Sequence, residues 1–453
     1  CPNADTQIVV GLENRHLRMN SIAVIGAGWA GVAAALTLSR AGAHVSIYES
    51  TQTPGGRARR VDRDGRSVDN GQHLLLGAYE RTTSLIRSLH PASEVPLLAL
   101  PLTLRSAPNT MPSLGIRAPE MPEPWNLLVG LIAADGLRAA EKIAAITWAA
   151  RILRGSAIDP LATVAALIAE QPMVMRQLIW APLCIAALNT PPEKASAVVF
   201  VEVLRRTFAG EKKASRMIIP TTDLTAAFPA PALAEIETRG GNIRIGTAAT
   251  SVINTEDGAA VVWGDSTHYF DAVITAVAPQ HVPRLLSREP AADLLADSLK
   301  TLTYEPITTL YFEFAYASPS PDNGVPMRML DGEPGQWLFW SRLHTGGWRA
   351  AVVISAHHRS EDEASLVAST LHQLARSYRL PVPSWRFVIT EKRATYSCSP
   401  AQTKLLSSLP KSIGRIHLAG DWCCPDLPAT IEAAVISGEN AANAALKESL
   451  NGR

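Results

Sequence analysis

The chain has 453 residues, of which 47% are hydrophobic, and carries a formal net charge of +1 at pH 7. This length predicts two or three domains around a large apolar core, and a net charge so close to zero provides no field that would gather nucleic acid or an acidic partner. The chain has five cysteines without a C-x-x-C spacing, so we expect an intracellular protein with neither a zinc site nor a disulfide framework.

The N-terminal residues and the longest apolar run predict no export signal and no membrane span. Residues 1–18, which precede Met19, include Asp5 and Glu13 and have no apolar core, so they do not resemble a signal peptide. The apolar run over residues 127–134 ends at Asp135, well short of the ~18 residues of a spanning helix. We expect a cytoplasmic protein without a nucleic-acid partner, and the sequence leaves open a peripheral contact of residues 125–131 with the cytoplasmic membrane.

The first expected elements are a buried strand over residues 22–25 and a helix over residues 29–41, joined by a G-x-G-x-x-G turn. Gly26 permits the tight turn, Gly28 leaves no Cβ between the backbone and a pyrophosphate, and Gly31 lets the helix lie close to the strand. The N–H groups and the positive dipole end of that helix would face the phosphates. The spacing therefore predicts a dinucleotide site.

A second strand, over residues 44–48, ends at Glu49, eighteen residues after Gly31. A carboxylate at this distance is expected to accept hydrogen bonds from the ribose hydroxyls of adenosine, and its charge disfavours a 2′-phosphate. The alternative is a glycine-rich turn in an unrelated α/β protein. The register of strand, helix, second strand and Glu49 favours the dinucleotide interpretation.

Gly55, Gly56 and Arg57 form a second expected close-approach turn, placed just after the ribose-binding strand. Such a turn can set the Arg57 cation near the pyrophosphate or the ring system of the cofactor. A surface turn with solvated arginines is the alternative, and the position of the turn relative to Glu49 argues against it.

The Gly-Gly-Arg turn, the D-x-G-x-H pattern at residues 69–73 and the I-H-L-A-G-D pattern at residues 416–421 resemble the flavin-binding signature of the amine oxidase and carotenoid desaturase superfamily. The resemblance implies FAD as the cofactor and an α/β fold, with a discontinuous Rossmann-like FAD-binding domain of the glutathione reductase type and an α+β substrate domain. It also implies that Asp421 meets the ribityl and pyrophosphate region, and that backbone near Ala249 meets the adenine. The final helix should begin at Pro428 or Ala429.

The resemblance implies the following cofactor contacts: Gly26, Gly28, Trp29, Ala30, Gly31, Glu49, Gly55, Gly56, Arg57, Ala249, Gly420, Asp421, Ala429 and Thr430. The expected FAD-binding segments are residues 20–105, 221–285 and 406–450, and the middle one should contain a hairpin over 249–262 and a strand over 269–277. The expected substrate domain comprises residues 106–220, with helices at 127–150, 161–169 and 198–208, and residues 286–405, with strands at 308–314, 336–340 and 349–355.

Three further segments, at residues 68–79, 180–190 and 418–430, resemble the squalene-associated flavoenzymes of bacterial hopanoid biosynthesis. This implies reduction of hydroxysqualene to squalene, a hydrophobic C30 isoprenoid as substrate, and NAD(P)H or a separate reductase as electron donor. Two alternatives stay open: a desaturase of a carotenoid or other polyisoprenoid, and a non-catalytic flavin-binding component of a terpenoid-synthesis complex. An amine oxidase is disfavoured, because no aromatic pair opposite a cationic substrate is apparent.

Removal of an allylic hydroxyl needs a general acid, for which His73 is the first candidate and Tyr79 the second. His73 is chosen because an imidazole ordinarily titrates near neutral pH. A structural histidine bonded to a backbone carbonyl is the alternative. Asp69 would either serve the flavin or orient His73.

The remaining chemistry-bearing residues have plain structural alternatives. Four aromatic side chains are candidates for stabilising developing positive charge, with packing in the core as the alternative: Trp180, Trp337, Phe339 and Trp340. Cys423 and Cys424 are expected to be inert thiols, because adjacent cysteines close a strained disulfide ring. The histidines at residues 357–358 lack a third ligand in register, which favours a solvated loop over a metal site.

Overall fold

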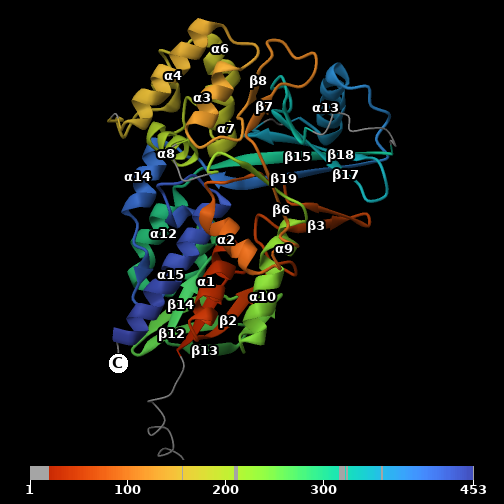
Figure 1. The fold of residues 1–453 in the computed structure, drawn as a ribbon. Coiled ribbons are helices and arrows are strands. Elements are labelled where there is room, and N and C mark those ends of the chain that lie inside the picture. Colours follow the sequence, from red (N-terminus) through yellow and green to blue (C-terminus); the bar gives the residue numbers. More distant parts are fainter. Residues whose placement is uncertain are drawn as a thin grey trace, which may run out of the picture.

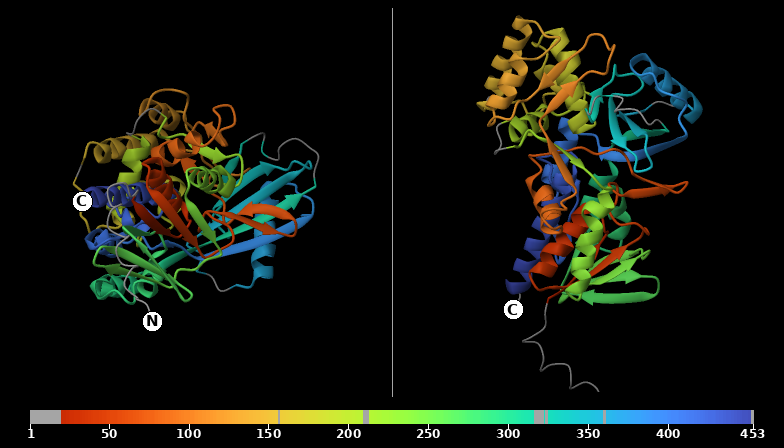
Figure 2. Two further views of the ribbon diagram at one scale, coloured as in Figure 1. Left: turned by 90° about the horizontal axis from the view of Figure 1, so that it is seen from below. Right: turned by 45° about the vertical axis from the view of Figure 1, so that its right-hand side comes forward.

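The computed structural model describes residues 20–155, 157–208, 213–315, 322, 325–358 and 361–451. Residues 1–18, for which we predict no signal peptide, lie outside the described residues. Among the helices of the described part, none is long and apolar enough to cross a membrane. Two views agree that the helices of residues 125–208 lie at one end of the molecule and the first βαβ unit lies at the other (Figures 1 and 2).

A six-stranded sheet carries the first βαβ unit, in the order β10-β2-β1-β14-β21-β20, and only the β21–β20 pair is antiparallel. Its strands are β1 (Ser21–Ile25), β2 (His44–Glu49), β10 (Asn242–Ile245), β14 (Ala272–Thr275), β20 (Ser412–Ile413) and β21 (Ile416–Leu418). Both faces of β1 are buried, which explains its continuous run of apolar residues. The two strands predicted around the glycine turn are confirmed.

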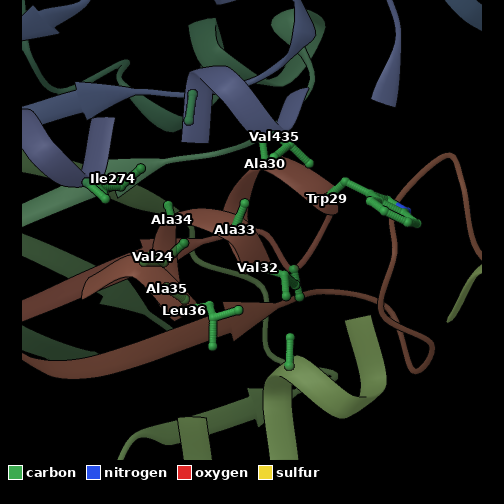
Figure 3. Packing of buried hydrophobic residues seen from close by; sticks show 14 of the residues in the cluster. Val24, Trp29, Ala30, Val32, Ala33, Ala34, Ala35, Leu36, Ile274 and Val435 are labelled. Atoms are coloured by element: carbon green, nitrogen blue, oxygen red, sulfur yellow. The ribbon is translucent and has the colours of Figure 1, made fainter. Parts of the chain in front are cut away.

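Three helices cover one face of this sheet: α1 (Trp29–Arg40), α10 (Pro229–Thr238) and α15 (Ile431–Asn451). Small side chains on α1, such as Ala33 and Ala34, pack between Ile274 and Val435 (Figure 3). A Cβ added at Gly438 of α15 would lie 2.1 Å from the carbonyl oxygen of Ala30, so glycine is required where the two helices cross.

The predicted start of the last helix is wrong by two or three residues. Thr430 lies outside the helix, and its hydroxyl accepts a hydrogen bond from the N–H of Ala433 at 3.2 Å. This is the position and the bond of an N-cap, so α15 begins at Ile431 and not at Pro428 or Ala429.

A three-stranded antiparallel sheet covers the opposite face, formed by β11 (Ser251–Thr255), β12 (Gly258–Trp263) and β13 (Ser266–Phe270). The predicted hairpin over 249–262 is confirmed. The predicted single strand over 269–277 is wrong, because the chain turns at Asp271 between β13 and β14. Asp271 is held there by a hydrogen bond from its own N–H to the Ser21 carbonyl and by one from the Ser21 N–H to its carboxylate, at 2.8 and 2.7 Å.

A second large sheet is antiparallel, in the order β16-β17-β18-β15-β19. Its strands are β15 (Tyr304–Phe314), β16 (Met327–Met329), β17 (Trp337–Arg342), β18 (Trp348–Ser355) and β19 (Trp385–Tyr396), and α13 (Glu363–Ser377) covers one face. The predicted strands over 308–314, 336–340 and 349–355 correspond to β15, β17 and β18. Along β17, Leu338 and Trp340 pack on the α13 side, whereas Trp337 and Phe339 belong to the opposite face.

The helices at the far end enclose a separate apolar cluster. They are α3 (Trp125–Ile132), α4 (Ala139–Leu153), α5 (Val164–Leu167), α6 (Met173–Met175), a π-helical turn η2 (Arg176–Trp180), α7 (Ala181–Leu188) and α8 (Ala197–Phe208). The helix predicted over 127–150 is two helices, since Gly136 has a φ of +81° in the turn between them. The helix predicted over 161–169 shortens to α5, and the one over 198–208 is confirmed.

The remaining α-helices and strands connect these parts. They are α2 (Glu80–Ser88), α9 (Leu224–Ala227), α11 (Val282–Leu285), α12 (Asp293–Lys300), α14 (Pro400–Ser408), β3 (Arg60–Arg63), β4 (Arg66–Asp69), β5 (Leu75–Leu76), β6 (Leu97–Leu100), β7 (Thr103–Arg105), β8 (Gly115–Arg117) and β9 (Met217–Pro220). The division of the chain into five domain segments stays a prediction.

Candidate functional site

The two glycine turns predicted from the sequence lie against each other. The N–H of Gly55 donates to the carbonyl of Ala27 at 2.8 Å, and Gly28 and Gly55 form a parallel bridge. Trp29 fixes the second turn from the first position of α1, since its indole N–H donates to the carbonyl of Ala58 at 2.9 Å. The ring of Trp29 also packs on Phe228 with 4.8 Å between centroids.

Each glycine of the first turn has a different reason to lack a side chain. A Cβ at Gly26, where φ is +102°, would lie 2.7 Å from the Ala276 carbonyl oxygen, and one at Gly31 would lie 1.9 Å from the Gly26 carbonyl oxygen. A Cβ at Gly28 would meet only the Cα of Gly56, at 3.8 Å, so Gly28 faces open space. No side chain caps α1 and no acid lies in its first turn, which includes Ala30. This helix end therefore suits a phosphate.

Glu49 is buried at the carboxyl end of β2, beside the N-terminus of α1. Its carboxylate accepts hydrogen bonds from the N–H of Ala27 and from the N–H of Thr51, each at 2.7 Å. Oε1 also accepts the Thr51 hydroxyl at 2.8 Å, so Oε2 is the oxygen that keeps a lone pair for a further donor such as a ribose hydroxyl. The segment just before Ala249 lies beside Glu49, since the N–H of Thr247 donates to the Glu49 carbonyl at 2.7 Å. Ala249 itself is half-buried against the β11 cluster.

Arg57 and Asp421, from opposite ends of the chain, form an ion pair. Nη2 of Arg57 lies 2.8 Å from both carboxylate oxygens of Asp421, and Nη1 donates to the carbonyl of Ala394 at 2.7 Å. Burial opposes the charge on Arg57, but the Asp421 carboxylate offsets it and raises the pKa of the guanidinium. The resemblance implied that Asp421 meets the ribityl and pyrophosphate region of FAD, and the pairing with Arg57 was missed because no local signal links residues so far apart.

The turn before Asp421 is built around Gly420, whose φ is +144° and whose N–H donates to the Ser437 hydroxyl at 2.9 Å. Ala429 is half-buried against the same cluster as Ala249. Ala429 and Thr430 connect this turn to the start of α15 at Ile431.

Glu432, which the sequence interpretation did not single out, ties α15 to α2. Its buried carboxylate accepts the N–H groups of Arg81 and Thr82 at 3.0 and 2.9 Å, so it caps α2 from a distant part of the chain. Tyr79 packs against the core of the parallel sheet and bonds to the side chain of Thr430. Burial and the Glu432 carboxylate raise the pKa of the Tyr79 phenol, so it stays protonated at neutral pH.

His73 is held by its neighbour, and its predicted titration near neutral pH is wrong. Nδ1 of His73 lies 2.8 Å from the carbonyl oxygen of Gly71, which is the structural alternative raised from the sequence. Burial lowers the pKa of His73 to about 4, although the bond to Gly71 acts in the opposite direction. The ring is therefore uncharged at pH 7.

In the D-x-G-x-H segment, the carboxyl group of Asp69 has a raised pKa. Burial raises its pKa to about 7, and the nearby Asp223 adds to this. Its carboxylate accepts the N–H of Leu224 at 2.8 Å, so it holds the start of α9 and does not orient His73. Its carbonyl accepts the hydroxyl of Tyr311 at 3.0 Å, which joins the D-x-G-x-H segment to β15.

The aromatic candidates differ in position. Trp180 is core: its ring lies 4.5 Å from that of Trp148, and its indole donates to Gln171 at 3.0 Å. Trp340 packs under α13 and so is placed on the wrong face of the sheet to share a site with Trp337. Phe339 is half-buried on the same face as Trp337.

The thiols and the paired histidines play structural parts. Cys423 and Cys424 are free, and burial raises the pKa of both, which agrees with the expected inert thiols. His357 is not solvated as predicted, because its ring is buried and bonds to the Thr308 hydroxyl at 2.8 Å. His358 pairs with the buried Glu305.

The class of protein follows from these features. The parallel sheet carries a glycine fingerprint, an uncapped helix end and the fixed carboxylate of Glu49, which together suit a dinucleotide. The Arg57–Asp421 pair lies next to a second sheet, as expected for a flavoprotein with a cofactor domain and a substrate domain. The comparisons agree with this class. The chain belongs to the family of flavin containing amine oxidoreductases, whose model matches residues 29–446. It is therefore an FAD-dependent oxidoreductase, and the predicted fold class and cofactor are confirmed.

The chain is similar over nearly its whole length to several bacterial proteins. It is 29% identical to hydroxysqualene dehydroxylase of Rhodopseudomonas palustris, over 94% of this chain and 98% of that protein. It is 28% identical to the hydroxysqualene dehydroxylase of Sinorhizobium fredii over 94% and 99% of the two chains. Cyclohexylamine oxidase from Brevibacterium oxydans has a similar fold, with a TM-score of 0.72 at 15% identity over 95% of this chain and 99% of that one.

Proposed function

We propose that the protein reduces hydroxysqualene to squalene. The allylic carbon–oxygen bond is replaced by a carbon–hydrogen bond, and two electrons and two protons are consumed as the hydroxyl leaves as water. Reduced FAD, when bound, supplies the hydride. The three relatives named hydroxysqualene dehydroxylase, 26–29% identical over 94% of this chain, support this substrate, as do the segments at residues 68–79, 180–190 and 418–430.

The observation that supports an isoprenoid best is the apolar surface next to the D-x-G-x-H segment. Leu74, directly after His73, is half-buried against the cluster that also holds Ile307 and Phe339 from the second sheet and Leu178 and Leu183 from the helical end. A C30 hydrocarbon gains affinity by burying apolar area at ~25 cal/mol per Å², and residues of this kind provide such a surface. We propose that the substrate lies along them.

We propose that the residues expected from the resemblance bind FAD, each part of the cofactor being held by a different segment of the chain. The open side of Gly28 and the first turn of α1, at Trp29 and Ala30, would take the pyrophosphate. Glu49 would accept the ribose hydroxyls, with Ala249 beside the adenine. Further residues would hold the ribityl and pyrophosphate region from the second turn and from the approach to α15: Gly55, Gly56, Arg57, Gly420, Asp421, Ala429 and Thr430.

His73 and Tyr79 stay the candidates for hydrogen bonding and proton delivery to the leaving hydroxyl. Since His73 is uncharged at neutral pH, its role there is that of a neutral hydrogen-bonding ring. Tyr79 keeps its phenolic proton, because burial and Glu432 raise its pKa. We further propose NAD(P)H or a separate reductase as the electron donor.

A second candidate function is desaturation of a polyisoprenoid. It is supported by 23% identity to a probable zeta-carotene desaturase of Synechococcus elongatus, over 94% of this chain and 98% of that protein. The two functions differ in the direction of hydride transfer, because a desaturase takes hydride from its substrate.

The purified protein should have the visible spectrum of bound flavin and, under reducing conditions, form squalene from hydroxysqualene. Anaerobic mixing separates the two functions. Reoxidation of the reduced flavin by hydroxysqualene supports the dehydroxylase. Bleaching of the oxidised flavin by a polyene such as phytoene, with no response to hydroxysqualene, would replace it with the desaturase.

A further inference from the structure

Exposed apolar side chains are concentrated at the helical end of the molecule. In the described part of the chain, thirteen large hydrophobic side chains are exposed, and seven of them lie at the helical end, between Trp125 and Val198. Single exposed hydrophobic residues are normal on a protein surface, but a local concentration indicates an interaction site. We therefore considered how this group is arranged.

Three members of the group share one face of α3. Trp125, Val129 and Ile132 are 58%, 38% and 55% exposed, and their spacing of four and three residues places them on one side of the helix. Ile143 on α4 is also exposed. The two helices adjoin here, since Nζ of Lys142 donates to the carbonyl of Ile132 at 2.7 Å. These four side chains form what we call the α3 strip.

The opposite face of α3 is fixed to the protein. The buried Asn126 donates to the Ser215 hydroxyl at 2.9 Å, and a Cβ added at Gly130 would lie 2.9 Å from the Arg117 carbonyl oxygen. Leu131 packs on the apolar cluster of the helical end. The α3 strip therefore faces outward from a helix held on its other side, and repacking inward would break these contacts.

The size of the α3 strip argues against a second protein chain as its partner. Its four side chains expose roughly 200–340 Å² of apolar surface, if a fully exposed tryptophan contributes ~150–250 Å² and each aliphatic residue about half as much. A stable protein interface buries ~800 Å² on each partner. The strip provides roughly a quarter to two-fifths of that area.

Two basic side chains lie at the α4 end of the α3 strip. They are Lys142, whose Nζ donates to the carbonyl of Ile132 at 2.7 Å, and the exposed Arg138, which is paired with the buried Glu141. Asp135 is an exposed carboxylate in the turn between the two helices. The carboxylate of Glu123, just before α3, is engaged by the N–H of Lys213 at 2.9 Å. A tryptophan beside aliphatic residues, with lysine and arginine at the border, is typical of segments that lie at the membrane–water interface.

We propose that the α3 strip docks the protein on an anionic phospholipid bilayer, with Trp125 and the aliphatic residues among the headgroups. The inference rests on the proposed function in one respect, namely that a C30 isoprenoid dissolves in the bilayer. Leu131 on the inner side of α3 belongs to the same apolar cluster as Leu74 and Phe339. Docking here places that cluster next to the lipid in which the substrate is dissolved.

The test uses the full-length protein with bound flavin and vesicles of phosphatidylcholine with about one-third phosphatidylglycerol. The wild type should sediment with these vesicles, and the Trp125→Ser/Ile132→Ser variant should bind them at least ~10-fold more weakly. The matched control is Leu294→Ser/Val382→Ser, which removes two side chains that are 85% and 89% exposed elsewhere, and it should bind like the wild type. A Lys142→Glu variant should lose binding to the anionic vesicles and leave the apolar residues intact.

Failure of the wild type to sediment with vesicles would overturn the proposal. So would a concentration-dependent dimer that is lost in the Trp125→Ser/Ile132→Ser variant, because the strip would then join two copies of the chain. Turnover of detergent-dispersed substrate separates this inference from the proposed function, since it should be the same in the strip variant and the wild type. Vesicle binding with no turnover in any form would remove the proposed substrate and leave the docking surface standing.

Discussion

Replacing Asp69 by asparagine should make the protein more stable at alkaline pH and change little in acid. Asp69 is a buried carboxyl group whose pKa is raised from 3.8 to about 7. Because the folded-state pKa is the higher one, the proton on Asp69 stabilises the fold fully below pH ~4, and this contribution is lost as the pH rises through ~7. An asparagine cannot ionise, and its side-chain oxygen can still accept the N–H of Leu224.

The magnitude follows from the two pKa values. Their difference corresponds to roughly 4 kcal/mol once the carboxyl group is ionised in both the folded and the unfolded state. At pH 5 the unfolded carboxyl group is largely ionised and the folded one is protonated, so roughly 1.5 kcal/mol of the penalty is already present. Between pH 5 and pH 8 the wild type should therefore lose roughly 2.5 kcal/mol relative to the asparagine variant.

Urea denaturation of both proteins at pH 5, 6, 7 and 8, followed by circular dichroism, measures this difference. Asp265→Asn, an exposed aspartate in the turn between β12 and β13, is the matched control and should show no such trend. Asp223→Asn should recover part of the effect, because the charge of Asp223 contributes to the raised pKa of Asp69. A difference between wild type and Asp69→Asn that is constant from pH 5 to pH 8 would refute the reasoning.

Three further predictions concern the cofactor and the reaction. Gly28→Ala should leave the apoprotein stable but yield colourless preparations. Gly31→Ala should destabilise the apoprotein itself, because the added Cβ would lie 1.9 Å from a carbonyl oxygen. Equal melting temperatures of the two apoproteins would contradict this. Arg57→Met should lower the free energy of unfolding by about 2–4 kcal/mol, because it leaves the Asp421 carboxylate buried without its cation. Adding Asp421→Asn should restore this stability but not the flavin content. Denaturation measures the first quantity and absorbance at 450 nm the second. His73→Ala should keep its flavin and lose about 10- to 100-fold in squalene formation, and turnover equal to wild type would exclude His73 from the mechanism.

Local patterns predicted the elements that depend on local physics. Examples are the β-branched run of β1, the glycine spacing after it, and the apolar patterns of β15, β17 and β18. Each of these patterns indicates its element from a few neighbouring residues alone. The break between α3 and α4 was missed, although the Asp-Gly pair at residues 135–136 is a turn signal, because the apolar residues on both sides outweighed it. Thr430 was likewise an available N-cap signal.

The sequence could name the residues of the site but not their partners. Arg57 and Asp421 each belong to a motif, but only the folded chain brings them within 2.8 Å. The caps that Glu432 provides for α2 leave no trace in either local sequence. The low pKa of His73 arises from burial by distant segments, which a pattern of residue types does not encode.

The strand order β10-β2-β1-β14-β21-β20 also determines when the protein can fold during its synthesis. The first βαβ unit leaves the ribosome well before its neighbours β21 and α15, which are synthesised ~400 residues later. At ~5–20 residues per second, the apolar face of α1 waits roughly 20–80 s for its partner helix. The apolar face of α1 stays without this partner over the interval, and a site that needs Asp421 can hold FAD only after β21 and α15 have been synthesised.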